Sequence, residues 1–310
     1  MSADMSDAEN MIIGALSSFG TVGLLQPTLY LKNARAQGLA PSFDPRVLYR
    51  GVGVNLANEM GQLSLQFGVT GFFKRLFPAT PSGELTAAAS AGGLVAFYAS
   101  PCELIMIQQQ RHGDSFFRTA RHVISRYGLV FSLSRGLSLS IARDAIFVGG
   151  MLGATPVFYT MLVDRMTART SGDEALGKGI GKDSTGSPDA ASKAQTAAAS
   201  LLASMMGGVL GSVLSHPFDV VNTCLKGDLD KSTYGGVRDT FRRLYREGGF
   251  ARLMNGSVWR GINVTATCWI ANECNIRLPT YVSPVTRGWL GWQGPPDRTR
   301  KAVEEEATCA

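Results

Sequence analysis

Charge is scarce in this chain of 310 residues. Asp, Glu, Lys and Arg make up 17% of the sequence, against roughly 25% in soluble domains. Cysteine and histidine are also few: the 5 cysteines include no CxxC pair, and the 3 histidines lack HExxH spacing. The composition excludes a disordered chain, a coiled coil and a disulfide-rich secreted module. We expect no metal site, and no nucleophile–base arrangement points to an enzyme.

The N-terminal segment MSADMSDAEN is acidic and polar, so it resembles neither a secretory signal nor an Arg-rich transit peptide. What the chain has instead is long uncharged stretches rich in glycine, with 36 glycines in all. Small residues let membrane helices approach closely, and a bilayer core needs about 20 mainly apolar helical residues. The uncharged stretches and their flanks predict six membrane helices, over residues 8–37, 52–77, 84–111, 137–164, 194–226 and 257–281.

The charges between these helices are strongly segregated. Loops 32–50, 106–135 and 222–260 together hold 17 basic and 6 acidic residues. The N-terminus, the two remaining loops and the C-terminal tail together hold 11 basic and 13 acidic residues. Such an asymmetry is typical of a multi-pass membrane protein that obeys the positive-inside rule, here with both termini on the other face. The basic residues lie in loops without aromatic platforms, so we expect no nucleic-acid partner.

A related motif closes the three odd-numbered helices. Each ends near a proline, in QPTLYLK with Pro27, SPCELIM with Pro101 and HPFDVVN with Pro217. A glycine then opens the next helix, at Gly51, Gly136 and Gly256. Proline inside a helix removes a backbone hydrogen bond and kinks the helix, so three kinks can close one end of a barrel.

These repeats resemble the mitochondrial carrier family, over about residues 8–285 and most closely in the third repeat. The resemblance implies an all-α membrane fold in which three two-helix repeats form six tilted helices around a central cavity. It also implies the inner mitochondrial membrane, with the outer membrane as the alternative, and both termini in the intermembrane space. The expected organisation is repeat 1 over 1–83, repeat 2 over 84–169, a Gly/Ser-rich linker over 170–192, repeat 3 over 193–286 and a polar tail over 287–310.

In the family, the acid and base after each proline form three ion pairs that close the matrix side. One such pair is ionic here, one can form a hydrogen bond and one is apolar, so we expect an interface that packs but no longer switches as three ion pairs. The ionic pair can be structural or part of a gate. The three pairs are Lys32 with Asp219, Glu103 with Asn222, and Leu29 with Met106.

The gate at the opposite end of the helices keeps even fewer of the family's charged residues. The family carries an acid and a base near the far end of each even helix, and only Lys74 keeps a charge here, where it also suits a snorkelling lysine. The six positions are Gly71 and Lys74, Pro156 and Tyr159, and Ile276 and Pro279. The first loop is short as well, with 24 residues from proline to glycine against 35 and 39 in the other repeats.

The substrate-cavity positions of the family fall on Asn58, Arg143 and Asn263, with Asp144 next to Arg143. The resemblance implies that Arg143 would hold a carboxylate and Asp144 an ammonium group, as for an amino acid or a carnitine-like zwitterion. The alternative is that Arg143 and Asp144 neutralise each other in a closed core. Three further charges in the helices, Glu59, Glu273 and Arg277, receive no role.

Helix N-termini offer free N–H groups to phosphate, and in the family such ends bind cardiolipin. The corresponding residues are Gly51, Gly136 and Gly256, with Arg50 and Arg135 beside the first two. We therefore expect the bilayer and cardiolipin as partners, and no cofactor. The degenerate gates favour a non-transporting accessory subunit that binds other subunits of a larger inner-membrane assembly. The alternative is a solute carrier that moves a small zwitterion by alternating access.

Overall fold

The computed structural model describes residues 7–78, 80–176 and 188–290, and these residues form helices and connecting loops. Six long helices dominate. The predicted helix boundaries agree closely with the structure at most ends, and the largest difference is at the α7–α8 connection. The long helices are α1 (Asp7–Ala36), α3 (Val52–Leu76), α4 (Pro81–His112), α7 (Leu137–Leu176), α8 (Pro188–Gly227) and α10 (Ser257–Leu290).

These helices form a closed ring. Each packs against the next along the chain, and α10 returns to pack against α1. Large apolar side chains remain exposed on the outside, among them Phe19 at 65%, Phe97 at 55% and Trp269 at 53% exposure. A ring with an apolar outer surface suits a bilayer, in which every helix satisfies its own backbone hydrogen bonds. The structure therefore has the all-α, three-repeat membrane fold that the sequence predicts.

Four stretches among the described residues are long and apolar enough to cross a membrane: Ile12–Ala36, Leu85–His112, Leu129–Met166 and Gln195–Gly227. Helices α3 and α10 complete the ring without such a stretch, and charged residues lie within them, including Glu59 in α3 and Arg260 and Glu273 in α10. Their place in the bundle follows from packing against the neighbouring helices rather than from hydropathy.

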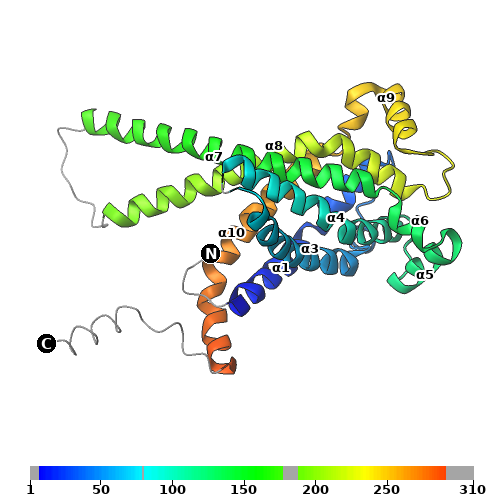
Figure 1. Ribbon diagram of the computed structural model, residues 1–310, viewed down its shortest axis with the longest axis horizontal. Coiled ribbons are helices and arrows are strands. Elements are labelled where there is room, and N and C mark those ends of the chain that lie inside the picture. Colours follow the sequence, from blue (N-terminus) through cyan, green and yellow to red (C-terminus); the bar gives the residue numbers. More distant parts are fainter. Residues whose placement is uncertain (1–6, 79, 177–187, 291–310) are drawn as a thin grey trace.

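Short helices gather at one end of the ring (Figure 1), which we call the basic end because the Lys- and Arg-rich loops lie there. Helix α5 (Phe116–Tyr127) and α9 (Val237–Leu253) are amphipathic and bury Val123 and Leu244 respectively. In the short first loop, α2 (Pro45–Leu48) has only 4 residues, and its Val47 and Leu48 cover Tyr30 and Leu31 of α1. The fourth short helix is α6 (Leu129–Ser134).

At the opposite end, α7 and α8 lie side by side and extend beyond the rest of the ring (Figure 1). Helix α7 continues to Leu176 and α8 begins at Pro188, so the helices reach into the segment 170–192 that we expected to be a linker. Residues 177–187 of that segment, and residues 291–310 of the expected tail, lie outside the described residues.

Glycines bring α7 and α8 together. A Cβ atom built on Gly150 would lie 2.9 Å from the Cα atom of Gly211, and one built on Gly149 would meet nothing within 4 Å. Gly149 and Gly153, like Gly207 and Gly211, have the spacing of close-packed membrane helices, and the structure uses Gly150, Gly207 and Gly211 for the close approach. On α7 the contact residue is thus Gly150 rather than Gly149. Spacing alone does not say which of two adjacent glycines faces the neighbouring helix.

Candidate functional site at the centre of the ring

Polar side chains meet where α1, α4 and α8 converge after their prolines. Lys32 of α1 and Asp219 of α8 form the pair expected from the repeat, with 2.9 Å between Lys32 Nζ and Asp219 Oδ2. Both side chains are almost fully buried, at 11% and 2% exposure. Two opposite charges in such a place stabilise each other, and either one alone would be costly to bury.

Glu103 of α4 takes different partners from the one expected. We predicted a hydrogen bond to Asn222, but the carboxylate is instead 2.7 Å from Lys226 Nζ. Lys226 lies four residues after Asn222, hence one turn further along the same face of α8. The amide of Asn222 contacts Ser140 Oγ at 2.9 Å, and Lys226 Nζ also donates to that hydroxyl. The base missing at position 222 is therefore supplied one turn later.

At the third pair, too, a polar contact lies one turn further along both helices. The predicted contact of Leu29 with Met106 stays a prediction, and a buried polar contact between α1 and α4 is made by Asn33 Nδ2, which donates to Gln110 Oε1 at 2.8 Å. Asn33 and Gln110 lie four residues after Leu29 and Met106. Met106 packs next to Gly51 at the start of α3. All three odd helices are consequently tied to one another by polar side chains.

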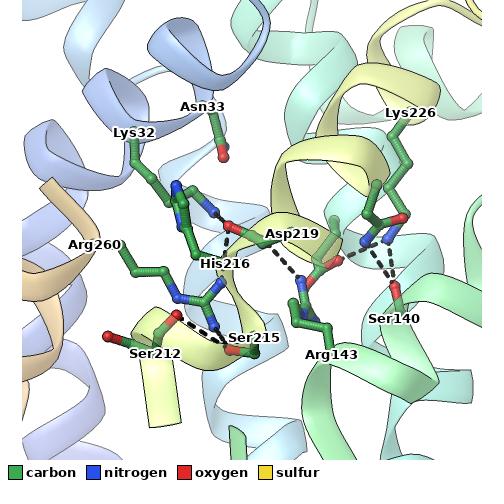
Figure 2. A network of polar contacts seen from close by, with 12 residues as sticks. Lys32, Asn33, Ser140, Arg143, Ser212, Ser215, His216, Asp219, Lys226 and Arg260 are labelled. Atoms are coloured by element: carbon green, nitrogen blue, oxygen red, sulfur yellow. Dashed lines mark hydrogen bonds and ion pairs between the residues drawn. The ribbon is translucent and has the colours of Figure 1, made fainter. Parts of the chain in front are cut away.

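Arg143 of α7 extends this cluster to an even helix (Figure 2). Its guanidinium group lies 2.6 Å from Glu103, 2.8 Å from Asp144 and 3.2 Å from Asp219, measured between N and O atoms. Asp144 is thus engaged by its neighbour, which was the alternative left open by the sequence. In this closed arrangement, Arg143 bridges the acids of α4 and α8.

Arg260 of α10 is a member that sequence reasoning did not find. Its Nη1 atom lies 3.1 Å from Asp219 Oδ2, and its Nη2 atom donates to Ser215 Oγ at 2.8 Å (Figure 2). The signal was present in the repeat, because Arg260 follows Gly256 by four residues, as Ser140 follows Gly136 and Asn55 follows Gly51. Only the third repeat places a charge at that step.

The cluster is close to neutral. It holds four cations, Lys32, Arg143, Lys226 and Arg260, and three anions, Glu103, Asp144 and Asp219. Glu59 of α3 interacts electrostatically with Glu103, Arg143 and Asp144. Near-neutrality matters because an excess charge inside a membrane bundle is expensive.

The remaining predicted cavity residues, Asn58 and Asn263, form no recorded hydrogen bond with Arg143 among the described residues. Asn263 Nδ2 donates to Thr28 Oγ1 of α1 at 2.9 Å. This hydrogen bond joins α10, the last helix of the ring, to α1, the first. Asn58 is 5% exposed, and its Oδ1 atom finds no hydrogen-bond partner among the described residues. The structure thus pairs Arg143 with Asp144 and Asn263 with Thr28.

The three repeat glycines share one conformation and one type of contact. Gly51, Gly136 and Gly256 have φ angles of 80°, 78° and 93°, which glycine adopts without the strain that a Cβ would cause. Each lies against the odd helix of another repeat: Gly51 beside Met106, Gly136 beside Asn222 and Gly256 beside Lys32. These contacts seat the start of each even helix on the ring.

The two arginines expected to bind phosphate differ in their surroundings. Arg135 donates to the carbonyl oxygens of Leu225, Asp228, Tyr234 and Gly235 at 2.8–3.1 Å, so its guanidinium caps the end of α8. Arg50 lies against Gly113 after α4, and its carbonyl accepts from Gln26 Nε2. A lipid role for the three glycines and the two arginines stays a prediction.

The far ends of the even helices carry few charged side chains that could form ion pairs between helices. Ile276 is 61% exposed, and the side chain of Lys74 lies outside the described part of the chain. Glu273 and Arg277 of α10 form an ion pair with each other, 2.7 Å apart. No ion pair between different helices is found among the described side chains at this end.

Fold and site together define a multi-pass membrane protein with a threefold helical repeat and a polar closure at one end. Residues 193–274 match the family model described as mitochondrial carrier protein. The chain is similar to members of the mitochondrial carrier family, and the match supports its membership. It is 28% identical over 253 residues to the mitochondrial carnitine/acylcarnitine carrier-like protein of Arabidopsis thaliana, which covers 73% of this chain and 76% of the relative.

A second relative is the mitochondrial 2-oxodicarboxylate carrier 1 of Saccharomyces cerevisiae. It is 28% identical over 225 residues, covering 67% of this chain and 63% of the relative. Both relatives are named as carriers, which supports membership of a transporter family rather than the accessory role that we expected from the degenerate motifs.

Proposed function

We propose that the protein is a solute carrier that moves a small zwitterion, an amino acid or a carnitine-like compound, across the inner mitochondrial membrane by alternating access. The observation that carries the proposal is the complete polar closure at the basic end. Lys32–Asp219, Glu103–Lys226 and Asn33–Gln110 join α1, α4 and α8 in all three pairings. A closure made of side-chain pairs between helices can be broken and re-formed, as alternating access requires.

The substrate class follows from Arg143 and Asp144. A planar guanidinium binds carboxylates in a bidentate manner, and a neighbouring carboxylate suits an ammonium group. Both charges are satisfied within the protein in the closed arrangement, so a bound zwitterion would replace internal partners with partners of the same chemistry. The name of the Arabidopsis relative is consistent with a carnitine-like solute.

The test is the thermal stability of the purified protein in detergent with a panel of amino acids and carnitine-like solutes. A solute that binds the folded state raises its stability by RT ln(1 + [L]/Kd). We expect one zwitterion to stabilise the wild type, and Arg143→Gln and Asp144→Asn to lose that stabilisation while still unfolding cooperatively. Uptake of the same solute into proteoliposomes must then exceed that of empty liposomes. No stabilisation by any solute would contradict the proposal.

A second candidate function is favoured by the far ends of the even helices, where the family's acid–base positions carry Pro156, Tyr159, Ile276 and Pro279. A bundle that closes at one end only would suit a non-transporting subunit of a larger inner-membrane assembly. A native gel of gently solubilised mitochondria separates the two candidates. Migration with a large complex would favour the subunit, and migration as a lone monomer would favour the carrier.

The orientation and lipid partners belong to the same proposal. The surplus of basic residues would place the basic end in the matrix, with both termini and the α7–α8 connection in the intermembrane space. Cardiolipin would bind at the helix starts after Gly51, Gly136 and Gly256, where backbone N–H groups are available to phosphate.

A further inference from the structure

The guanidinium group of Arg260 lies further from the basic end than the position of Arg260 in the sequence implies. Arg260 lies one helical turn before Asn263, nearer the basic end of α10. Its Cζ atom nevertheless lies 5.8 Å from the centre of the Phe147 ring, and Phe147 follows Arg143 by one turn of α7. The guanidinium group therefore extends to Phe147, one turn beyond Arg143 on α7, and α7 and α10 both pack against α8.

Arg143 and Arg260 hold the same carboxylate from two sides. Arg143 Nη1 is 3.2 Å from Asp219 Oδ1, and Arg260 Nη1 is 3.1 Å from Asp219 Oδ2. Lys32 already neutralises Asp219 at 2.9 Å. Asp219 thus faces three cations, more than one carboxylate needs, and two of them are guanidinium groups suited to a second carboxylate.

One polar atom of Arg260 is left over in this arrangement. Arg260 Nη1 is within ion-pair distance of Asp219 but makes no hydrogen bond of good geometry among the described residues, although it is shielded from solvent. A buried donor without a hydrogen bond is costly. A ligand oxygen between Arg143 and Arg260 would remove that cost.

We propose that Arg260 is a substrate-binding residue, which together with Arg143 takes the carboxylate of the transported solute in place of Asp219. The inference rests on the proposed carrier function and deepens it. It makes a carboxylate obligatory in the substrate and leaves Asp144 to receive the cationic group. Asp219 keeps Lys32 as its partner when the solute arrives, so the exchange leaves no acid unpaired.

The test compares solutes that differ by a carboxylate. Carnitine and ornithine carry one, whereas choline and putrescine do not. We expect the wild type to bind a carboxylate-bearing member at least about tenfold more tightly than its partner. Arg260→Gln should remove most of that preference by raising the apparent Kd and the KM for uptake, with a smaller effect on the maximal rate.

Arg277→Gln is the matched control, because it makes the same change on the same helix at a side chain that is 76% exposed. It should keep the wild-type preference. Arg260→Lys retains the charge but loses the planar fork, and should recover only part of the preference. Cooperative unfolding of each variant without solute shows that it is folded.

The outcomes separate the two claims. If wild-type protein binds none of the four solutes and no member of the wider panel, the carrier function fails and the role of Arg260 fails with it. If the wild type distinguishes the pairs and Arg143→Gln abolishes this, but Arg260→Gln keeps the preference within about twofold, the carrier function stands and the role of Arg260 is overturned. Equal loss of affinity for both members of a pair would assign Arg260 a structural role and also overturn the inference.

Discussion

Lys226 is a fully buried lysine whose ammonium group bonds to Glu103 and Ser140 at 2.7 and 2.9 Å. A lysine in such a place is tolerated because the acid and the hydroxyl replace water. At the residue scale, the sequence predicted which helices would meet but not which turn would supply the partner. The family positions carry Asn222, Leu29 and Met106, and the structure places polar contacts at the residues four positions later. Counting from a proline cannot reveal this, since residues one turn apart share a helix face.

The first prediction concerns Lys226→Met, which keeps the length of the side chain and removes its charge. We expect a loss of about 1–3 kcal/mol in the free energy of unfolding, because Glu103 keeps Arg143 but loses one buried partner. A double-mutant cycle with Glu103→Gln should give a coupling energy of about 0.5–3 kcal/mol, measured by thermal or denaturant unfolding in detergent. Lys231→Met, at an exposed lysine of the next loop, should change stability little. Strict additivity of the Lys226 and Glu103 substitutions would contradict the pairing.

At the element scale, six long helices could be predicted almost to the residue at many ends, because uncharged stretches and repeat glycines mark them. Helix α7 was predicted to end near 164 and continues to Leu176, since Gly and Ser in a charged segment predict a linker only weakly. The helices α5 and α9 follow from the longer second and third loops. The choice of Gly150 rather than Gly149 as the contact residue depends on the rotation of α7 about its axis, which spacing does not report.

The second prediction uses two neighbouring glycines of α7. Gly150→Ala should lower the free energy of unfolding by about 1–3 kcal/mol, because the new Cβ would overlap α8 at Gly211. Gly149→Ala meets open space and should be neutral or stabilising by up to about 1 kcal/mol, since alanine favours helix more than glycine does. Unfolding temperatures of the two variants, measured in the same detergent, check the difference. Equal effects would mean that α7 is rotated differently from the structure.

The third prediction concerns the turn that follows α8. The Asp228 carboxylate accepts hydrogen bonds from the backbone N–H groups of Ser232, Thr233 and Tyr234 at 3.2, 2.6 and 2.7 Å. Burial raises the pKa of Asp228, but these hydrogen bonds outweigh it and lower the pKa below its ordinary value.

A group whose pKa is lower in the folded state stabilises the protein above its unfolded pKa, which is about 3.9 for aspartate. That stability is lost as the pH falls through the folded pKa. Asp228→Asn should therefore reduce stability at pH 7 by about 1–3 kcal/mol, and the difference from wild type should shrink below about pH 4. Thermal unfolding as a function of pH measures it. A difference that stays constant down to pH 3 would show that the carboxylate charge is irrelevant here.

At the scale of the whole molecule, the closed ring has its loops sorted by charge between two ends. Helices α5 and α9 lie at the basic end, and the end of α7 and the start of α8 lie at the other (Figure 1). This sorting could be predicted from the sequence, because it depends on summed loop charges rather than on any one contact. The full extent of the electrostatic cluster could not, beyond Lys32 with Asp219 and Arg143 with Asp144, since it joins residues of α1, α4, α7, α8 and α10 through long side chains whose reach depends on the tilt of each helix.

The fourth prediction tests the orientation of the whole molecule. In a variant without its natural cysteines, a cysteine at position 117 of α5 and one at position 184 of the α7–α8 connection should label from opposite sides of the inner membrane. Phe117 is 82% exposed at the basic end. An impermeant thiol reagent added to intact mitoplasts should modify Ser184→Cys and spare Phe117→Cys until the membrane is opened. The reverse pattern would invert the topology.

The clamp made by Arg135 bears on which parts of the bundle can move. Its guanidinium joins the start of α7 to the carbonyl end of α8, and the glycine contacts join the two helices further along. Helix α7 is the last helix of the second repeat and α8 is the first of the third. The extensive contact between α7 and α8 therefore crosses the expected boundary between the second and third repeats, and we expect these two helices to move together rather than each with its own repeat.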